Sequence, residues 1–114
     1  KLLFLLLFIP IFAFTVFDLE YGKVSYYGKK FHGKKTASGE IFDMNKMTCA
    51  AIKEYPLGSK LKVTNIRNNK SVIVRVNDRG AFRKYGRTLD LSRGAFDKIA
   101  NLDRGVIKVS IEKM

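Results

Sequence analysis

Alternating apolar and polar residues predict two neighbouring β-strands in the middle of the chain. In residues 60–66 and 71–77, leucine or valine recurs at every second position, with Asn65 as the least clean member of the pattern. Asn68 and Asn69 separate the two stretches, and asparagine tolerates the positive φ that a tight turn requires. The sequence therefore predicts a β-hairpin.

Two further strands are predicted on either side of this hairpin. Residues 22–28 form an aromatic and β-branched run between two glycines. In residues 105–113, isoleucine and valine alternate with lysine and serine. Both stretches are short enough to belong to one small sheet.

A short helix is predicted for residues 91–100, because apolar residues recur there at helical spacing. Either Asp90 or Ser92 can cap its N-terminus. Several short strands with one helix, and without a βαβ rhythm, favour a small closed β-barrel over a sandwich or a parallel sheet. The predicted apolar face of the helix comprises Leu91, Ala95, Phe96 and Ile99.

The apolar run at the N-terminus is predicted to be an export signal and not part of the fold. It is shorter than the roughly 18 to 20 apolar residues that a spanning helix needs. Because the chain begins with Lys1, we expect this signal to be truncated at its start. We assign residues 1–17 to a signal peptide or N-terminal apolar segment and residues 22–114 to one domain. An uncleaved N-terminal anchor is the alternative, and in either case the domain is expected in the periplasm or cell envelope, or secreted.

Composition limits the kinds of partner and site. The chain has 114 residues, which fits one domain, and its 22 Lys+Arg against 10 Asp+Glu give a formal charge of +12 that attracts polyanions. Nucleic acid, anionic lipid and anionic cell-wall polymer all fit this charge, but export favours the cell wall. One cysteine and one histidine cannot form an intramolecular disulfide or an ordinary zinc site, so we expect no cofactor and no metal.

Four acidic residues lie beside glycines or at the ends of predicted strands, where a side chain can reach a groove. Asp78 follows a predicted strand, and its structural alternative to catalysis is a turn-forming role. Asp90 precedes the predicted helix, and its alternative is the N-cap. The other two, Glu40 and Asp43, can also be solvated loop acids.

Aromatic, imidazole and basic side chains are candidates for the walls of such a groove. Tyr26 and Tyr27 can stack on sugar rings, although aromatic residues on a short strand are more often core residues. His32 lies in a basic loop, where loop packing or a hydrogen bond to a ligand is favoured over a role as catalytic base. The basic candidates for a surface that faces an anionic polymer are Lys34, Lys35, Arg79, Arg83, Lys84 and Arg87.

The order of motifs along the chain resembles the rare lipoprotein A (RlpA) family. The motifs are SYYG, FHGKKTASGEIFD, PLGSKLKVTN, SVIVRVNDRGAF and GRTLDLSRGAF, and the resemblance covers residues 22 to about 112. The resemblance implies a mainly β fold, a small six-stranded double-psi β-barrel with one or two short helices. Characterised members of the family are lytic transglycosylases that cut peptidoglycan, and plant expansins and family-45 endoglucanases are more distant relatives.

The resemblance also implies roles for individual residues. Asp90 in LDLS matches the acid of related barrels, and Asp78 in NDRG matches its partner. Asp43, in GEIFD, matches an acidic residue of the family's groove and is the third expected catalytic residue. The residues expected to bind substrate are Glu40, Tyr26, Tyr27, His32 and Arg79.

One residue of the family pattern is absent. Members carry a histidine in a TAAH segment shortly before an LPFGT segment, whereas the corresponding stretch here is TCAAIKEYPLGS. The histidine position is Ile52, or Ala51 if a residue is inserted. This departure keeps open a reading in which the domain binds glycan without cutting it.

The sequence as a whole predicts a secreted lytic transglycosylase of the cell wall. It would cleave glycan strands between N-acetylmuramic acid and N-acetylglucosamine and leave 1,6-anhydro ends. The alternative is a non-catalytic, expansin-like module that binds glycan or peptidoglycan. We expect peptidoglycan glycan strands as the partner, no nucleic acid, no stable membrane span after signal removal, and a monomer.

Overall fold

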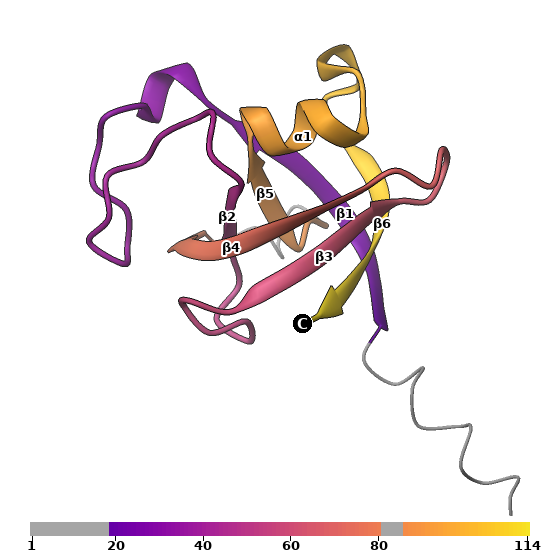
Figure 1. Cartoon of the computed structure of the whole chain (residues 1–114), viewed down its shortest axis with the longest axis horizontal. Coiled ribbons are helices and arrows are strands. Elements are labelled where there is room, and N and C mark those ends of the chain that lie inside the picture. Colours follow the sequence, from indigo (N-terminus) through magenta and orange to yellow (C-terminus); the bar gives the residue numbers. More distant parts are fainter. Residues whose placement is uncertain (1–18, 81–85) are drawn as a thin grey trace, which may run out of the picture.

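The strands of the protein close into a six-stranded β-barrel, seen in a computed structural model that describes residues 19–80 and 86–114 (Figure 1). In this described part, the helical elements are α1 (Arg93–Ile99) and two 3-10 turns, η2 (Lys29–Phe31) and η4 (Leu102–Arg104). The mainly β architecture with short helical elements confirms the predicted fold class. The strands are β1 (Leu19–Tyr27), β2 (Thr48–Ala51), β3 (Lys60–Asn65), β4 (Ser71–Arg79), β5 (Leu89–Ser92) and β6 (Ile107–Lys113).

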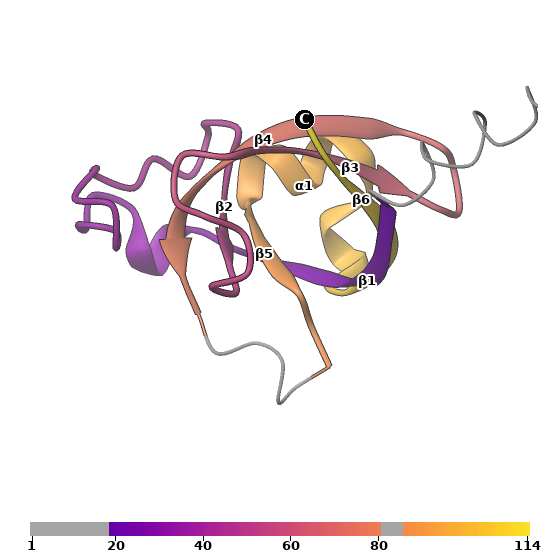
Figure 2. The same cartoon turned by 90° about the horizontal axis from the view of Figure 1, so that it is seen from below.

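The order of strands around the barrel brings distant segments of the chain together. It runs β1-β5-β2-β4-β3-β6, and β6 pairs with β1 to close the barrel. The pairs β1/β5 and β2/β4 are parallel, and the other pairs are antiparallel. In Figure 2, α1 lies behind the opening that the strands enclose, so it covers one end of the barrel. Because of this strand order, β5 and β4 lie on the two sides of β2.

The predicted hairpin is confirmed. β3 and β4 pair antiparallel, with Leu61 opposite Val74 and Val63 opposite Val72, and all four side chains are buried. Asn69 has a φ of 64°, the left-handed conformation that asparagine tolerates in a turn. Alternation therefore directs one face of each strand into the barrel.

The two outer predicted strands also form, and they pair with each other. β1 begins at Leu19, earlier than the predicted start at residue 22, because its first residues pair with the end of β6 around Glu112. In β6, alternate residues are buried, as the sequence pattern predicts: these are Ile107, Val109 and Ile111.

The helix is shorter than predicted, and its N-terminal end differs. Leu91 belongs to β5 and is fully buried inside the barrel, so its placement on the helical face is wrong. Ala95, Phe96 and Ile99 are fully buried on α1, as predicted. Ser92 is the N-cap, because its Oγ accepts a hydrogen bond from the N–H of Ala95 at 3.1 Å. The alternative cap, the aspartate two residues earlier, therefore stays outside the helix.

Close backbone contacts hold the segment from residue 28 to residue 47, called the 28–47 loop below, against α1. The N–H of Gly94 donates to the carbonyl of Met44 at 2.8 Å, and Ser92 Oγ donates to the carbonyl of Lys46 at 2.5 Å. A Cβ on Gly94 would lie 2.9 Å from a backbone oxygen of the loop, so this contact requires glycine. The loop extends outward beside β2 and β4 (Figures 1 and 2).

Two short strands, β2 and β5, lack the alternation by which a strand is recognised in a sequence. All residues of β2 are buried, because a strand covered on both faces has no polar side. In β5 a single half-buried position interrupts a buried run, and the sequence pattern assigned its last two residues to the helix. These strands form the middle of the site described below.

Part of the sequence prediction lies outside the described residues. This applies to the predicted signal segment, residues 1–17, and to Arg83 and Lys84. None of the helices in the described part of the chain has the length and apolar character that crossing a membrane requires.

Candidate active site

Two aspartates lie on the outer face of the barrel, on opposite sides of β2. Ala50 of β2 pairs with Asp90 of β5 on one side and with Asp78 of β4 on the other. Residues paired across strands share a face, and neighbouring strands lie about 4.8 Å apart, so the two aspartate α-carbons are about 10 Å apart. Ser25 of β1 pairs with Asp90 and extends the row over four strands. The structure thus brings the two predicted carboxyls onto one face.

Asp90 is held in place by two neighbours. Leu89 and Leu91, which flank it in β5, are fully buried inside the barrel, whereas its own side chain is 15% exposed and points the other way. The hydroxyl of Ser25 donates a hydrogen bond to Asp90 Oδ1, and Nε of Arg87 lies 3.6 Å from the same oxygen. A carboxyl restrained in this way keeps one orientation, which a group that transfers a proton requires.

Asp78 reaches the outer face through an irregularity in β4. The β2–β4 register shifts by one residue, so that Asn77 is skipped and Asp78 pairs with β2. Its Oδ1 accepts hydrogen bonds from the N–H groups of Ala37 at 3.0 Å and Arg79 at 2.9 Å. Its Oδ2 accepts from the hydroxyl of Tyr27 at 3.4 Å. Three donors fix this carboxyl and join the 28–47 loop to β4.

Tyr27 serves the site as a hydrogen-bond donor. Its ring stacks on Phe42 with centroids 4.4 Å apart and an interplanar angle of 16°, and it meets Phe31 edge-on at 5.7 Å. Burial, together with the negative charge of Asp78, raises the pKa of the Tyr27 phenol far above its ordinary value. The phenol therefore stays protonated and can donate to the carboxylate at any physiological pH.

Tyr26, the other tyrosine predicted to bind substrate, lies elsewhere. Tyr26 directly precedes Tyr27 in β1, and successive side chains of a strand point to opposite faces. Its ring packs on Phe96 of α1 with centroids 4.7 Å apart, and its hydroxyl donates to the carbonyl of Leu102 at 3.1 Å. The structure therefore places Tyr26 between the barrel and α1 and does not bring it to the two aspartates.

Glu40 anchors the 28–47 loop to the barrel wall. Its two carboxylate oxygens accept from the two terminal nitrogens of Arg75 at 2.9 and 2.7 Å, and Asn77 Nδ2 donates to one of them at 3.1 Å. These hydrogen bonds, the one from Arg75 first, lower the pKa of Glu40 to about 2. Glu40 was expected to bind substrate, and the structure shows that its carboxylate is hydrogen-bonded to Arg75 and Asn77.

His32 and Asp43 make local contacts within the same loop. His32 Nδ1 accepts a hydrogen bond from the N–H of Met44 at 3.2 Å, and Asp43 Oδ1 accepts from the N–H of Asn45 at 2.9 Å. In the described part of the chain, no hydrogen bond or ion pair joins either side chain to the two aspartates. Their connection to the site runs through the loop, whose Phe42 stacks on Tyr27.

Arg79 and Ile52 lie beside the end of β2. The guanidinium of Arg79 donates to the carbonyl of Tyr55 at 2.9 Å and thereby fixes the segment that follows β2. Ile52, which with Ala51 is one of the two positions expected to correspond to the family histidine, is only 7% exposed. It directly follows β2 and belongs to the cluster of buried apolar side chains.

Metal or thiol chemistry has no obvious site in the described residues. No group of three or more His, Cys, Asp or Glu side chains there is arranged to hold a metal ion. Burial raises the pKa of the Cys49 thiol to about 12, so this thiol is neutral and a poor nucleophile. The chemistry that the geometry offers is proton transfer by carboxyl groups.

Sequence reasoning missed Ser25. Its hydrogen bond to Asp90 spans 65 positions in the sequence and depends on the parallel pairing of β1 with β5. The available signal is the polar alternation in β1, where Ser25 shares a face with Tyr27. That signal gives the face but not the partner.

Characterised proteins are similar to this chain in sequence and in fold. Residues 20–111 match the sequence profile of the family described as lytic transglycolase. The endolytic peptidoglycan transglycosylase RlpA of Vibrio cholerae is 55% identical over 93 residues, which are 82% of this chain and 35% of that protein. The protein of the same name from Neisseria meningitidis serogroup A is 48% identical over 93 residues, 82% of this chain and 38% of that protein. The chain thus spans about a third of the length of these curated relatives.

Solved structures share the barrel. The Streptomyces papain inhibitor superposes with a TM-score of 0.69 at 28% identity, covering 84% of this chain and 94% of that one. A Clavibacter michiganensis expansin in complex with cellohexaose superposes with a TM-score of 0.66 at 22% identity, covering 84% of this chain and 50% of that one. The second likeness is evidence for the fold alone.

Proposed function

Because this chain belongs to the lytic transglycolase family, we propose that it forms the catalytic domain of a lytic transglycosylase that cleaves peptidoglycan glycan strands. The observation that carries the proposal is the placement of Asp90. Its carboxyl is restrained by Ser25 and flanked by Arg87, and it shares the outer face with a second fixed carboxyl, Asp78. One restrained acid is enough for this reaction.

In the proposed reaction Asp90 acts first as acid and then as base. Its protonated carboxyl gives a proton to the glycosidic oxygen between N-acetylmuramic acid and N-acetylglucosamine as the bond from that oxygen to the anomeric carbon breaks. The resulting carboxylate then takes the proton of the muramic acid 6-hydroxyl as this oxygen attacks the same carbon. The product carries a 1,6-anhydro ring, and the acid returns to its starting state.

Asp78 is assigned the supporting role. Held by three hydrogen-bond donors, it provides a negative charge in a fixed position, which stabilises the positive charge that develops at the anomeric carbon. Asp43 is included on the family resemblance, from its place in the 28–47 loop. We assign Tyr27 to orienting Asp78, and we place Glu40 and His32 in the support of the same loop.

The proposed setting is the cell envelope. A domain that cuts peptidoglycan must be exported, which agrees with the predicted signal in residues 1–17. We propose that the exported domain acts as a monomer, with glycan strands as its partner. The positive charge of the chain suits an anionic wall polymer.

A second candidate function is glycan binding without cleavage. Ile52 favours it, because a buried aliphatic side chain stands where family members carry histidine. Loss of one general acid or base commonly costs about 100 to 10,000-fold in rate, so the change can slow the reaction without abolishing it. Cleavage creates anhydro ends in the glycan, whereas binding alone leaves the strands intact.

The test is to incubate the purified protein with glycan strands freed of peptides and to examine the products by mass spectrometry. Anhydro-muramyl ends are expected from the wild type, with a rate about 1,000-fold lower for Asp90→Asn. Absence of products together with retained sedimentation on sacculi would favour the binding function. Equal rates for wild type and Asp90→Asn would show that another group is the acid.

A further inference from the structure

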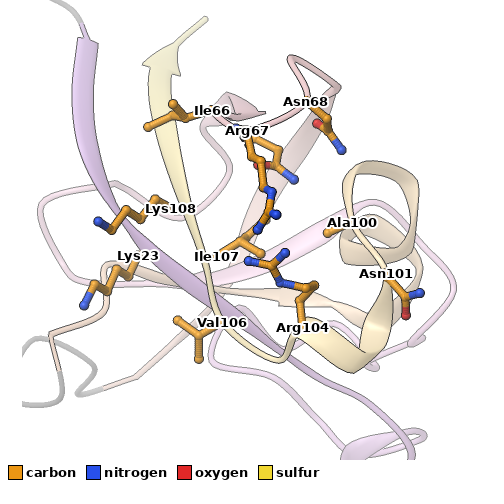
Figure 3. Close-up of a pocket in the computed structure, with 11 residues that line it drawn as sticks. Lys23, Ile66, Arg67, Asn68, Ala100, Asn101, Arg104, Val106, Ile107 and Lys108 are labelled. Atoms are coloured by element: carbon orange, nitrogen blue, oxygen red, sulfur yellow. Dashed lines mark hydrogen bonds between the residues drawn. The ribbon is translucent and has the colours of Figure 1, made fainter.

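A hollow away from the two aspartates is lined by positive charge. It has a volume of about 760 Å³ and lies between β1, the β3–β4 turn, the segment after α1 and the start of β6. Four of its lining side chains are cations, and none of the acidic side chains that the structure describes lines it. The cations are Lys23, Arg67, Arg104 and Lys108 (Figure 3). We call this hollow the basic cleft.

The two lysines of the basic cleft form a like-charge pair. Lys23 of β1 and Lys108 of β6 are directly opposite each other in the antiparallel register. Like charges in such cross-strand positions destabilise a sheet. A pair of this kind is relieved when an anion binds between or beside the two ammonium groups.

The two arginines face the cleft from the other side. In Figure 3 the side chains of Arg67, from the β3–β4 turn, and Arg104, from η4, extend toward one another. In the described part of the chain, none of the four cations forms an ion pair. Asp97 and Asp103 line an adjoining hollow, which shares Asn68, Ala100 and Asn101 with the basic cleft.

The remaining lining groups are fixed or apolar. Asn65 and Asn68 both donate to the carbonyl of Ile99, at 2.8 and 3.0 Å, so their amides serve the structure. Ile66 and Val106 add apolar surface beside the charges. The cleft therefore combines free cationic donors with an apolar wall, which suits a charged group carried on a sugar ring.

We propose that the basic cleft binds a phosphate group carried on a sugar. Two arginine forks that approach from different directions match the several oxygens of a tetrahedral phosphate better than the two oxygens of a carboxylate. The proposal does not depend on the activity assigned to Asp90, since it concerns different side chains and binding alone.

The test is an NMR titration of the protein with glucosamine 6-phosphate, at constant ionic strength because screening weakens such contacts. Saturable shifts are expected at the backbone amides of Arg67, Arg104 and Lys108. Glucosamine and acetate are expected to give no saturable shifts there. Acetate binding as tight as the phosphosugar would overturn the choice of phosphate. Binding to phosphatidylglycerol vesicles without binding of the phosphosugar would overturn the assignment to a sugar.

A matched pair of variants separates the cleft from general charge. The double variant Arg67→Gln/Arg104→Gln is expected to weaken phosphosugar binding at least about tenfold, since it removes two charged donors. The control Lys53→Gln/Lys60→Gln removes the same charge from exposed positions that do not line the cleft. An equal loss in both, or no saturable binding by the wild type, would overturn the proposal. Thermal melting of both variants checks that they fold.

Discussion

Asp78 and Asp90 pair with the same alanine of β2 from opposite sides, so twelve positions of sequence separate two carboxyls that share one face of the barrel. The arrangement depends on the parallel β2/β4 pair, the antiparallel β2/β5 pair and the register shift in β4. Each carboxyl has its own hydroxyl donor on β1, Ser25 for one and Tyr27 for the other. Each of these hydroxyls can be removed by a single substitution, which tests its effect on the carboxyl that it contacts.

Ser25→Ala is expected to lower kcat about tenfold and to leave KM nearly unchanged. The hydroxyl donates to Asp90 and orients it, and a hydrogen bond of this kind is worth about 0.5 to 1.5 kcal/mol, the upper end of which corresponds to about tenfold in rate. Steady-state rates of anhydro-muramyl formation provide the measurement. Ser25→Thr retains the hydroxyl and should recover most of the rate. A rate for Ser25→Ala equal to that of the wild type would remove Ser25 from the orientation of the acid.

Tyr27→Phe is expected to lower activity by several-fold to about tenfold, because the hydrogen bond to Asp78 is lost while the ring stack on Phe42 remains. Tyr26→Phe is the matched control. It loses a hydroxyl that donates to the carbonyl of Leu102, away from the aspartates, so it should lose about 1 kcal/mol of stability and keep its activity. Similar losses of activity in both variants would contradict the assignment of Tyr27 to the site.

The position of the missing histidine can be tested by restoring it. Ile52 stands two residues beyond Ala50, the residue that pairs with both aspartates. Ile52→His is expected to raise the rate of glycan cleavage by about tenfold or more, as an added general acid or base would. It should also lower the free energy of unfolding by about 1 to 3 kcal/mol, since a polar ring replaces a side chain that is only 7% exposed.

Ile52→Leu is the control for that substitution, because it changes shape without adding a titratable group. No increase for Ile52→His over Ile52→Leu would mean that this position does not limit the reaction. Chemical denaturation of both variants separates a loss of fold from a loss of rate.

The sequence predicted the strands that have one buried and one exposed face, and it missed the strands that are buried on both faces. β3, β4 and β6 alternate because one side meets the barrel interior and the other meets solvent. β2 is buried throughout and carries no such signal. The boundary of α1 was misplaced because Leu91 fits helical spacing as well as it fits β5.

The candidate site shows the same division. Asp78 and Asp90 were recognisable from their places at predicted element ends and from the family resemblance. The partners that orient them were not, because they come from β1 and depend on strand order around the barrel. The same limit applies to Glu40, whose partner Arg75 lies 35 positions away.

Glu40→Gln is expected to destabilise the protein in a pH-dependent way. The Arg75 guanidinium holds the folded-state pKa of Glu40 at about 2, below the ordinary 4.5 of a glutamate in an unfolded chain. A carboxylate with a lowered folded-state pKa contributes stability that is fully present above the unfolded value and is lost as pH falls through the folded value. The contribution of Glu40 should therefore be constant near pH 7 and disappear between about pH 4.5 and pH 2.

The size of this contribution is limited by solvent, because the Glu40 side chain is 33% exposed. We expect a loss of about 1 kcal/mol at pH 7 for Glu40→Gln, near the upper end for exposed pairs because the contact is bidentate. Urea denaturation at pH 7, 4 and 2.5 gives the measurement, and the difference from wild type should shrink at each step. Glu112→Gln, at an exposed position of β6, should change stability by less than about 0.5 kcal/mol. A difference for Glu40→Gln that persists undiminished at pH 2.5 would assign the loss to packing of the 28–47 loop and not to its charge.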